Sequence, residues 1–428
     1  MSSLSSIVRM EQLSALISEK EKLLTDFLAS KELEAPSLSV DELAKLEVSP
    51  DDNKSFKART ELIKATRELH DIFLGPRETL MALAWGLQAI WEFKIAEAVP
   101  TNGYIRFEEL SVKIEECTGK TILPFQFQIL LRHAMTNQIF YEPQKGWVAH
   151  TQMSRLLATN PKSNAWVGFM TGDLFPAFAN VVNAMKKSPG SQEPNETGVN
   201  VAYSQDLPFY DFVQLDKGCA MRYSRAIESH GSSEGTDILH GVVDGYPWAN
   251  LGDATVVDMG GNMGYVSVAI AEVFPKLKFV VQDTKGMRSA EPLARVPQSL
   301  RDRVELTIHD FFDVQPIVAK AYLFRHVFHS FPDKYSIKIL QSLVPALRKG
   351  ARIIINNGML PEPGTLSYVD ERSIRTLDVV MLTVTNSRER ELNDWRKLFR
   401  DADPRYKFLR AWKPSKSQLW FIEAEWNP

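Results

Sequence analysis

The chain has 428 residues, of which 44% are hydrophobic and 24% charged, and its formal net charge is −3. This length predicts two or three packed domains, and the composition is typical of a soluble globular protein with a sizeable core. The charge balance excludes bulk attraction to nucleic acid or an anionic membrane, and two distant cysteines, Cys117 and Cys219, exclude a disulfide framework.

The N-terminal region, residues 1–57, is predicted to be a helix and a linker. Apolar residues recur with helical spacing from 9 to 29, whereas Pro36 and Pro50 favour a mobile connection over 30–56. A second long helix is expected over 78–98, apolar nearly all round and therefore buried or in an oligomer interface. The chain shows neither a secretory signal nor a membrane span, so we expect a cytoplasmic protein.

Residues 58–160 are predicted to form a winged-helix-like dimerisation domain. Helix signals at 106–117 and 124–137 precede a hairpin pattern over 139–150. Such a fold can bind DNA, but the would-be recognition helix has one certain positive charge, Arg132. A DNA reader needs several basic side chains facing phosphates, so we favour a packing module without a nucleic-acid partner.

Residues 161–250 are predicted to be a helical region that contributes to a substrate pocket. The segment is rich in aromatic residues and methionines, which form core and can line a pocket for a large apolar ligand. From 251 to 428, strands alternate with helices, which predicts a doubly wound parallel sheet of the Rossmann-like α/β class.

The most specific motif is an apolar strand that runs into Gly260-Gly261-Asn262-Met263-Gly264 and then a helix. The glycines let the backbone approach a ligand. The next strand ends in Asp283, where a carboxylate can accept hydrogen bonds from both ribose hydroxyl groups. A nicotinamide dinucleotide is the alternative ligand. However, the sequence motif that binds it has glycine at the position of Met259, and Asp258 would repel its pyrophosphate. Asp258 can instead attract the ammonium of a methionine moiety, which favours S-adenosyl-L-methionine.

A third strand ends in Asp310-Phe311. Asp310 can accept a hydrogen bond from an adenine amino group. Phe311 can stack on the ring, with ordinary core packing as the alternative.

With these motifs in order, the chain resembles the fungal class I O-methyltransferases related to plant caffeate-type enzymes, over residues 58–428. The matching segments are 150–154, 256–261, 280–283, 309–312, 322–329 and 359–364. The resemblance implies a swapped homodimer with a helical N-terminal domain over a catalytic Rossmann domain, acting on a small hydrophobic polyketide or alkaloid.

In that family the general base is the histidine of a His-Asp-Trp sequence, which here is His329-Ser330-Phe331. Two carboxylates support it, and the resemblance places Glu389 in one position and Asn357 in the other. Asn357 can orient the ring but adds no negative charge, so the base is weakened. Methyl transfer to an acidic phenol or enol would tolerate this loss.

Intact cofactor residues beside altered base residues favour the pericyclase branch of the family. Its members keep the cofactor without consuming it and catalyse Diels–Alder, hetero-Diels–Alder or Alder-ene cyclisations of pyridone or polyketide intermediates. Such a step needs a preorganised pocket and hydrogen-bond donors, for which Arg325, His326 and His150 are the candidates. Arg325 has a cofactor contact as its alternative role, His326 a core position, and His150 a helix cap.

We therefore predict a pericyclase, with a genuine O-methyltransferase of an aromatic or polyketide hydroxyl as the alternative and a non-catalytic binding protein as a third class. The predicted catalytic residues are His329, His326, Arg325, His150 and Glu389. The predicted cofactor residues are Asp258, Gly260, Gly261, Gly264, Asp283, Asp310, Phe311 and Arg325. The predicted substrate pocket contains His133, Phe169, Met170, Met221, Asn357 and Met381, and no metal is expected.

Overall fold

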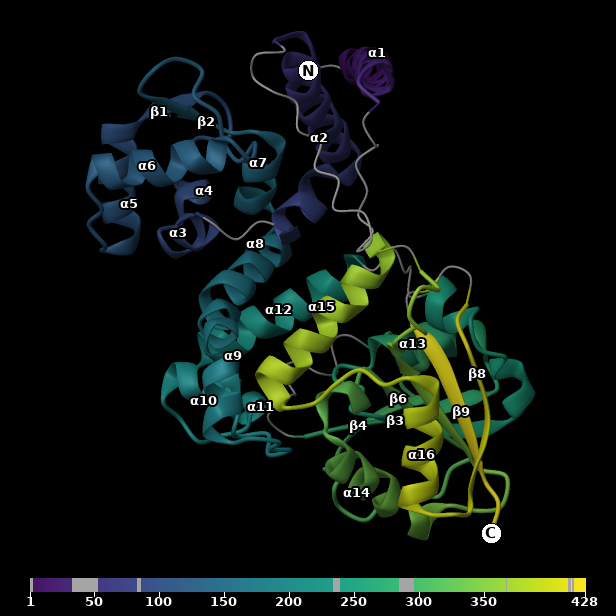
Figure 1. Ribbon diagram of the computed structural model, residues 1–428. Helices are drawn as coiled ribbons and strands as arrows, with labels where there is room; N and C mark the ends of the chain where they lie inside the picture. Colours follow the sequence, from purple (N-terminus) through teal and green to yellow (C-terminus); the bar gives the residue numbers. More distant parts are fainter. Residues whose placement is uncertain are drawn as a thin grey trace. The chain divides into compact units, whose positions relative to one another are not determined.

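The computed structural model describes residues 3–32, 53–82, 86–233, 239–284, 296–366, 368–414, 417 and 419–428 (Figure 1). The chain divides into two compact units, Met1–Thr159 and Asn160–Pro428. This division lies next to the domain boundary that we predicted at residue 160.

The first unit begins with two long helices that pack on one another, α1 (Ser3–Ser30) and α2 (Asn53–Ala82). Leu24 of α1 and Ala58 of α2 are buried in their contact. Helix α1 starts earlier than the predicted residue 9. Most of the linker predicted over 30–56 lies outside the described residues.

The single helix predicted over 78–98 is wrong. Helix α2 runs from Asn53 to Ala82 with a non-helical kink at Gly75 (φ 76°), just before the predicted start, and it is followed by α3 (Leu87–Glu92) and α4 (Ile95–Ala98). The backbone is left-handed at Gly86 (φ 82°) and Lys94 (φ 48°), the residues directly before α3 and α4, so neither helix continues the segment that precedes it. An apolar pattern does not reveal such a turn, because the apolar residues on either side of it are buried in any case.

The rest of this unit contains the predicted helices and a two-stranded ribbon. Its elements are β1 (Tyr104–Arg106), α5 (Phe107–Thr118), α6 (Pro124–Met135), β2 (Trp147–Ala149) and α7 (Gln152–Thr159). β2 pairs with β1, whereas the predicted first arm at 139–142 makes only one bridge, Tyr141 to Ala149. Left-handed backbone at Gln138 and Phe140 interrupts that arm.

The second unit begins with a helical region rich in buried aromatic side chains. It contains α8 (Pro161–Gly168), a π-helical segment (Phe169–Leu174), α9 (Phe175–Lys187), α10 (Gly198–Tyr203), α11 (Phe209–Gln214) and α12 (Lys217–Ser233). Phe169, Phe209 and Val384 belong to one apolar cluster that joins this region to α15 (Tyr368–Thr385).

A seven-stranded sheet in the order β5-β4-β3-β6-β7-β9-β8 follows, and its five parallel strands, β5-β4-β3-β6-β7, have the order of a Rossmann-like fold. Its strands are β3 (Ala254–Met259), β4 (Leu277–Asp283), β5 (Val304–Ile308), β6 (Ala321–Arg325), β7 (Arg352–Asn357), β8 (Tyr406–Trp412) and β9 (Trp420–Trp426). The first five are parallel, and β9 runs antiparallel to β7 and β8.

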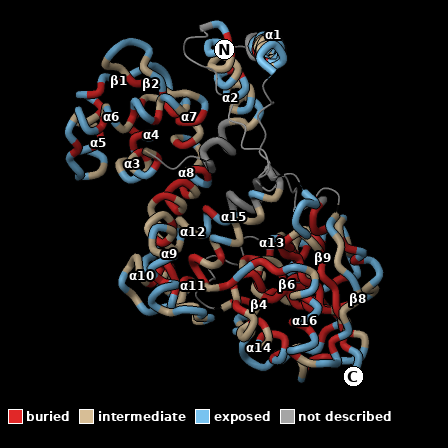
Figure 2. The backbone as a smooth tube through the Cα atoms, viewed as in Figure 1, coloured by how far each residue is buried: buried red, intermediate tan, exposed pale blue. Residues whose placement is uncertain are grey.

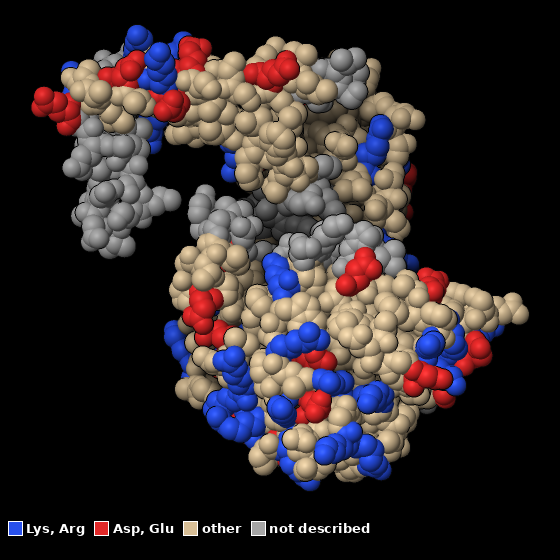
Figure 3. All heavy atoms as spheres, turned by 90° about the vertical axis from the view of Figure 1, so that its right-hand side faces the viewer, with Lys and Arg blue, Asp and Glu red and all other residues tan. Residues whose placement is uncertain are grey.

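Helices cover both faces of this sheet, which is the most deeply buried part of the unit (Figure 2). One face packs against α13 (Tyr265–Val273), and the other against α14 (Asp333–Leu343) and α16 (Leu392–Ala402). Basic and acidic side chains are interspersed on the face of this unit drawn in Figure 3. On β9, Glu423 forms ion pairs with Arg410 and Arg352. No described helix has the length and apolar character that crossing a bilayer requires.

Candidate active site

The candidate site lies where the strand order reverses. β3 stands between β4 and β6, so the crossovers leave it in opposite directions and open a crevice at the carboxyl ends of the strands. The glycine turn follows β3, Asp283 ends β4, Arg325 ends β6 and Asn357 ends β7. Four separated stretches of the sequence therefore meet at one edge of the sheet.

The glycine turn closely surrounds Asp258. Gly260 and Gly264 have φ angles of 72° and 75°, which favour glycine, and a Cβ on Gly261 would stand 2.5 Å from Oδ2 of Asp258. The backbone N–H of Asn262, in the same turn, donates to Oδ2 of Asp283 at 2.8 Å. The turn thus connects the two carboxylates and leaves no room for side chains at its centre.

Asp258 is buried in this turn, and its Oδ2 accepts a 2.6 Å hydrogen bond from Ser267 on α13. The pKa of Asp258 is raised to about 6, chiefly by burial; the Ser267 hydroxyl and Arg325 lower it, and the charge of Asp283 raises it. A buried carboxylate with an elevated pKa gains stability from a bound cation. The position therefore suits a positively charged ligand group.

Of the other predicted cofactor residues, Phe311 borders the turn and Asp310 follows β5. Phe311 lies 3.6 Å from where a Cβ on Gly260 would stand, and its ring packs edge-on against Phe331 at 5.4 Å between ring centroids. Asp310 is exposed, and its Oδ1 accepts the backbone N–H of Phe312 at 2.9 Å.

His329 lies in the short helical turn Phe328–Ser330 after β6, and its ring is paired with a carboxylate. Nδ1 of His329 is 2.8 Å from Oε1 of Glu389, and both side chains are buried. An ionised glutamate in this position accepts a hydrogen bond from Nδ1–H, which leaves Nε2 as the nitrogen with a free lone pair. This arrangement can remove a proton from a substrate hydroxyl.

Asn357 contacts the carboxylate and not the ring that we expected it to orient. Its Nδ2 donates to Oε2 of Glu389 at 3.2 Å, and Asn357 is completely buried. The two oxygens of Glu389 thus have different partners, the imidazole on one side and the amide on the other.

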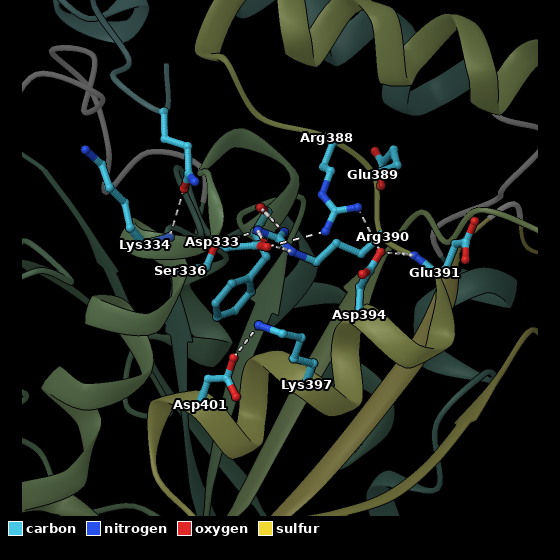
Figure 4. A network of polar contacts seen from close by, with 12 residues as sticks. Asp333, Lys334, Ser336, Arg388, Glu389, Arg390, Glu391, Asp394, Lys397 and Asp401 are labelled. Atoms are coloured by element: carbon cyan, nitrogen blue, oxygen red, sulfur yellow. Dashed lines mark hydrogen bonds and ion pairs between the residues drawn. The ribbon is translucent and has the colours of Figure 1, made fainter. Parts of the chain in front are cut away.

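Arg390 supports the base segment, and the sequence analysis did not identify it. Its guanidinium is fully buried and donates to the carbonyl oxygens of Phe328 and Phe331, on either side of His329-Ser330. It also donates to Asp333 at 2.9 Å and Ser336 at 3.0 Å, at the start of α14 (Figure 4). Arg390 therefore holds the His329 turn, while its neighbour Glu389 contacts the ring.

Ser330 has a partner that its sequence context does not indicate. Its Oγ is 2.7 Å from the hydroxyl of Tyr210 on α11, and both residues lie beside the base segment. Burial raises the pKa of Tyr210, with a smaller lowering by the Ser330 hydroxyl. A neutral hydroxyl pair thus occupies the place where the family has an aspartate.

The predicted hydrogen-bond donors at the end of β6 have partners within the unit. Nη1 of Arg325 donates to the Tyr265 hydroxyl at 3.2 Å. His326 has left-handed backbone (φ 54°), and its ring centroid is 5.2 Å from that of His329. A non-glycine residue in this conformation is uncommon and is often found at a functional site.

Two predicted site residues belong to the first unit. Nδ1 of His150 is 2.9 Å from the Ser154 hydroxyl, and Nε2 is 3.2 Å from the Val99 carbonyl oxygen. Burial lowers the pKa of His150, whereas its contact with the Val99 carbonyl raises it. Both ring nitrogens are thus engaged inside the first unit, by the Ser154 side chain and the Val99 carbonyl and not by backbone N–H groups of α7. His133 is exposed on α6.

The aromatic region of the second unit encloses a cavity of about 100 Å³. It is lined by Phe169, Asp173, Val199, Tyr203, Phe209, Phe212, Val213, Leu215, Asp216, Cys219 and Tyr223. Phe169 was predicted here. Of the other predicted pocket residues, Met170 and Met381 belong to the surrounding apolar cluster, and Met221 is exposed on α12. In the described part of the chain, no cluster of three or more His, Cys, Asp or Glu is arranged to hold a metal ion.

Comparison with known proteins identifies related chains. Residues 192–403 match the family model described as the O-methyltransferase domain. The chain is 37% identical to the grayanic acid biosynthesis cluster O-methyltransferase of Cladonia grayi, over 99% of this chain and 89% of that protein. It is 36% identical to the chlorophenol O-methyltransferase of Trichoderma longibrachiatum, over 98% and 90%. Among solved structures it is similar in fold to OxaC in complex with SAH and oxaline, with a TM-score of 0.68 and 20% identity, over 97% of this chain and 99% of that chain.

Proposed function

The chain belongs to the O-methyltransferase family, whose cofactor is S-adenosyl-L-methionine, and from this premise we propose that it methylates an aromatic or polyketide hydroxyl with His329 as the general base. The observation that carries the proposal is the buried pair of His329 and Glu389. The relatives named above are O-methyltransferases, so this alternative fits better than the pericyclase that we predicted first.

The residues of the crevice fit the cofactor. Gly261 lets the backbone of the turn pack directly against the Asp258 carboxylate, and Asp283 can still accept hydrogen bonds from ribose hydroxyl groups on its remaining lone pairs. The carboxylate of Asp258, hydrogen-bonded to Ser267, would face the ammonium of the methionine moiety. Phe311 would border the adenine ring. When bound, S-adenosyl-L-methionine supplies an electrophilic methyl group.

The chain's own residues supply the proton chemistry. Glu389 holds Nδ1 of His329, so that Nε2 is free to accept the proton of a substrate hydroxyl as its oxygen gains the methyl group. The imidazolium that forms is stabilised by the Glu389 carboxylate. Arg390 keeps the turn that carries His329 in place.

The test is methyl transfer from labelled cofactor. Purified protein incubated with methyl-labelled S-adenosyl-L-methionine and a panel of phenols and aromatic polyketides is expected to release labelled methyl ethers, identified by mass spectrometry. Conversion of a polyketide or pyridone substrate into an isomer without label would contradict the proposal and restore the pericyclase prediction. The homodimer and the cytoplasmic location also remain predictions.

Replacing Asp258 with asparagine is expected to weaken cofactor binding by about tenfold or more at pH 7, because a charge-assisted contact becomes neutral. Isothermal titration measures the affinity. Asp253→Asn, which alters an exposed carboxylate just before β3, is the control and should leave affinity unchanged. An Asp258→Asn protein with wild-type affinity would exclude the contact with the ammonium.

The same substitution is expected to stabilise the cofactor-free protein at neutral pH. The folded pKa of Asp258, about 6, lies above its ordinary value of 3.8, so the folded state binds this proton more tightly. The wild type should therefore lose stability as the pH rises from about 4 to about 6, by on the order of 3 kcal/mol. Asp258→Asn lacks this loss, and urea unfolding at several pH values compares the two. Equal pH dependence of both proteins would contradict the assignment.

A further inference from the structure

The carboxylate of Glu389 is shared between a base and an amide. Oε1 faces Nδ1 of His329 at 2.8 Å, and Oε2 accepts from Nδ2 of Asn357 at 3.2 Å. A Cβ on Gly358 would stand 2.8 Å from Oε2, so the residue after Asn357 must be small for the carboxylate to reach the end of β7. Both Glu389 and Asn357 have no exposed surface.

The charged groups around this pair do not replace the missing acid. Asp378 on α15 accepts the backbone N–H of Glu389 at 2.7 Å, and its carboxylate points to that amide. Burial raises the pKa of Asp378, and the charge of Glu389 raises it further. Arg390 binds Asp333 and two carbonyl oxygens, and the neighbouring ring of His326 packs on His329. A single carboxylate thus contacts the imidazole.

We propose that Asn357 is a positioning residue that holds Glu389 against His329 without a second charge, and that the resulting base is restricted to acidic hydroxyls, phenols and enols, and excludes aliphatic alcohols. The proposal rests on the proposed O-methyltransferase function and names its substrate class.

The restriction follows from the proton transfer itself. The proton moves from the substrate oxygen to Nε2 of His329, and each pKa unit by which the hydroxyl exceeds the imidazolium makes the transfer up to tenfold less favourable. A phenol has a pKa of about 10, whereas a water-like hydroxyl has a pKa of about 16. A second carboxylate would stabilise the imidazolium and so reduce the difference between its pKa and that of the substrate hydroxyl. Asn357 supplies a hydrogen bond but no charge, and this pKa difference stays large.

The experiment compares wild type with Asn357→Asp and Asn357→Ala in methyl transfer to phenols of matched size and graded acidity, and to an aliphatic alcohol. In the wild type, kcat is expected to fall as the phenol pKa rises, and the alcohol should not react. Asn357→Asp should introduce an additional ionisation in the kcat–pH profile, since two buried carboxylates share a proton. At pH values above that ionisation, kcat for weakly acidic phenols should rise about tenfold relative to kcat for strongly acidic phenols.

Asn357→Ala removes the donor and should lower kcat by about tenfold for every phenol, with KM unchanged. Asn356→Ala is the matched control, because Asn356 is equally buried but its amide donates to the Trp420 carbonyl oxygen on β9. It should keep the wild-type dependence on phenol acidity. Affinity for the cofactor, measured separately, reports whether each variant has folded.

Two failures can be told apart. If the wild type transfers no label to any hydroxyl, the proposed function is wrong. If it methylates phenols and aliphatic alcohols alike, or if Asn357→Asp keeps the wild-type ratio between weak and strong acids at every pH, only the role of Asn357 is overturned.

Discussion

Replacing His329 with alanine is expected to lower the rate of methyl transfer by about 10²- to 10⁴-fold, because the hydroxyl proton then has no positioned acceptor. Cofactor affinity should change little, since His329 is paired with Glu389 and the cofactor residues lie on the glycine turn and β4. The measurement is kcat with labelled cofactor, together with the cofactor dissociation constant.

Two further variants, one at Glu389 and one at an exposed histidine, serve as comparison and control for this result. Glu389→Gln keeps the size of the side chain and removes its charge, so its kcat should lie between that of the wild type and that of His329→Ala. His70→Ala changes an exposed histidine of α2 and should leave the rate unchanged. A His329→Ala enzyme with wild-type turnover would show that another group is the base.

Replacing Arg390 with methionine is expected to reduce the free energy of unfolding by about 3–5 kcal/mol, because it leaves a buried hydrogen-bond network without its central donor. The carbonyl oxygens of Phe328 and Phe331 lose their partner, and Asp333 loses one of its cations. Urea unfolding followed by tryptophan fluorescence measures the change. Where the variant remains folded, kcat should also fall, since the His329 turn is no longer held.

Arg388→Met is the matched control, two residues earlier in the chain. Arg388 is half exposed and pairs with Asp333 and Asp394 at the surface, so its loss should cost about 1 kcal/mol or less. Equal effects of the two substitutions would show that burial of Arg390 adds nothing to stability.

Local sequence patterns predicted the glycine turn and the acidic strand end beside it, and the structure places both at the carboxyl ends of neighbouring strands. The glycine turn, the strand before it and Asp283 at the end of the next strand lie within about thirty residues, where steric rules relate residue type directly to backbone geometry. Alternating strands and helices predicted the Rossmann-like fold, which the structure confirms. Here the sequence was informative because each feature depends on neighbours along the chain.

The contacts around the base were decided by tertiary packing. Nothing in the sequence distinguishes Arg390 from Arg388, and only the close approach of α14 buries one guanidinium and leaves the other in water. Likewise, Asn357 meets Glu389, and Tyr210 meets Ser330, across 32 and 120 positions of the chain. The helix break at Lys94 was also not predictable, because the left-handed backbone there falls on a lysine and not on a glycine. Sequence alone identified the residue types of this site, but which oxygen faces which donor depends on how distant elements pack, because hydrogen bonds act only over a few ångströms.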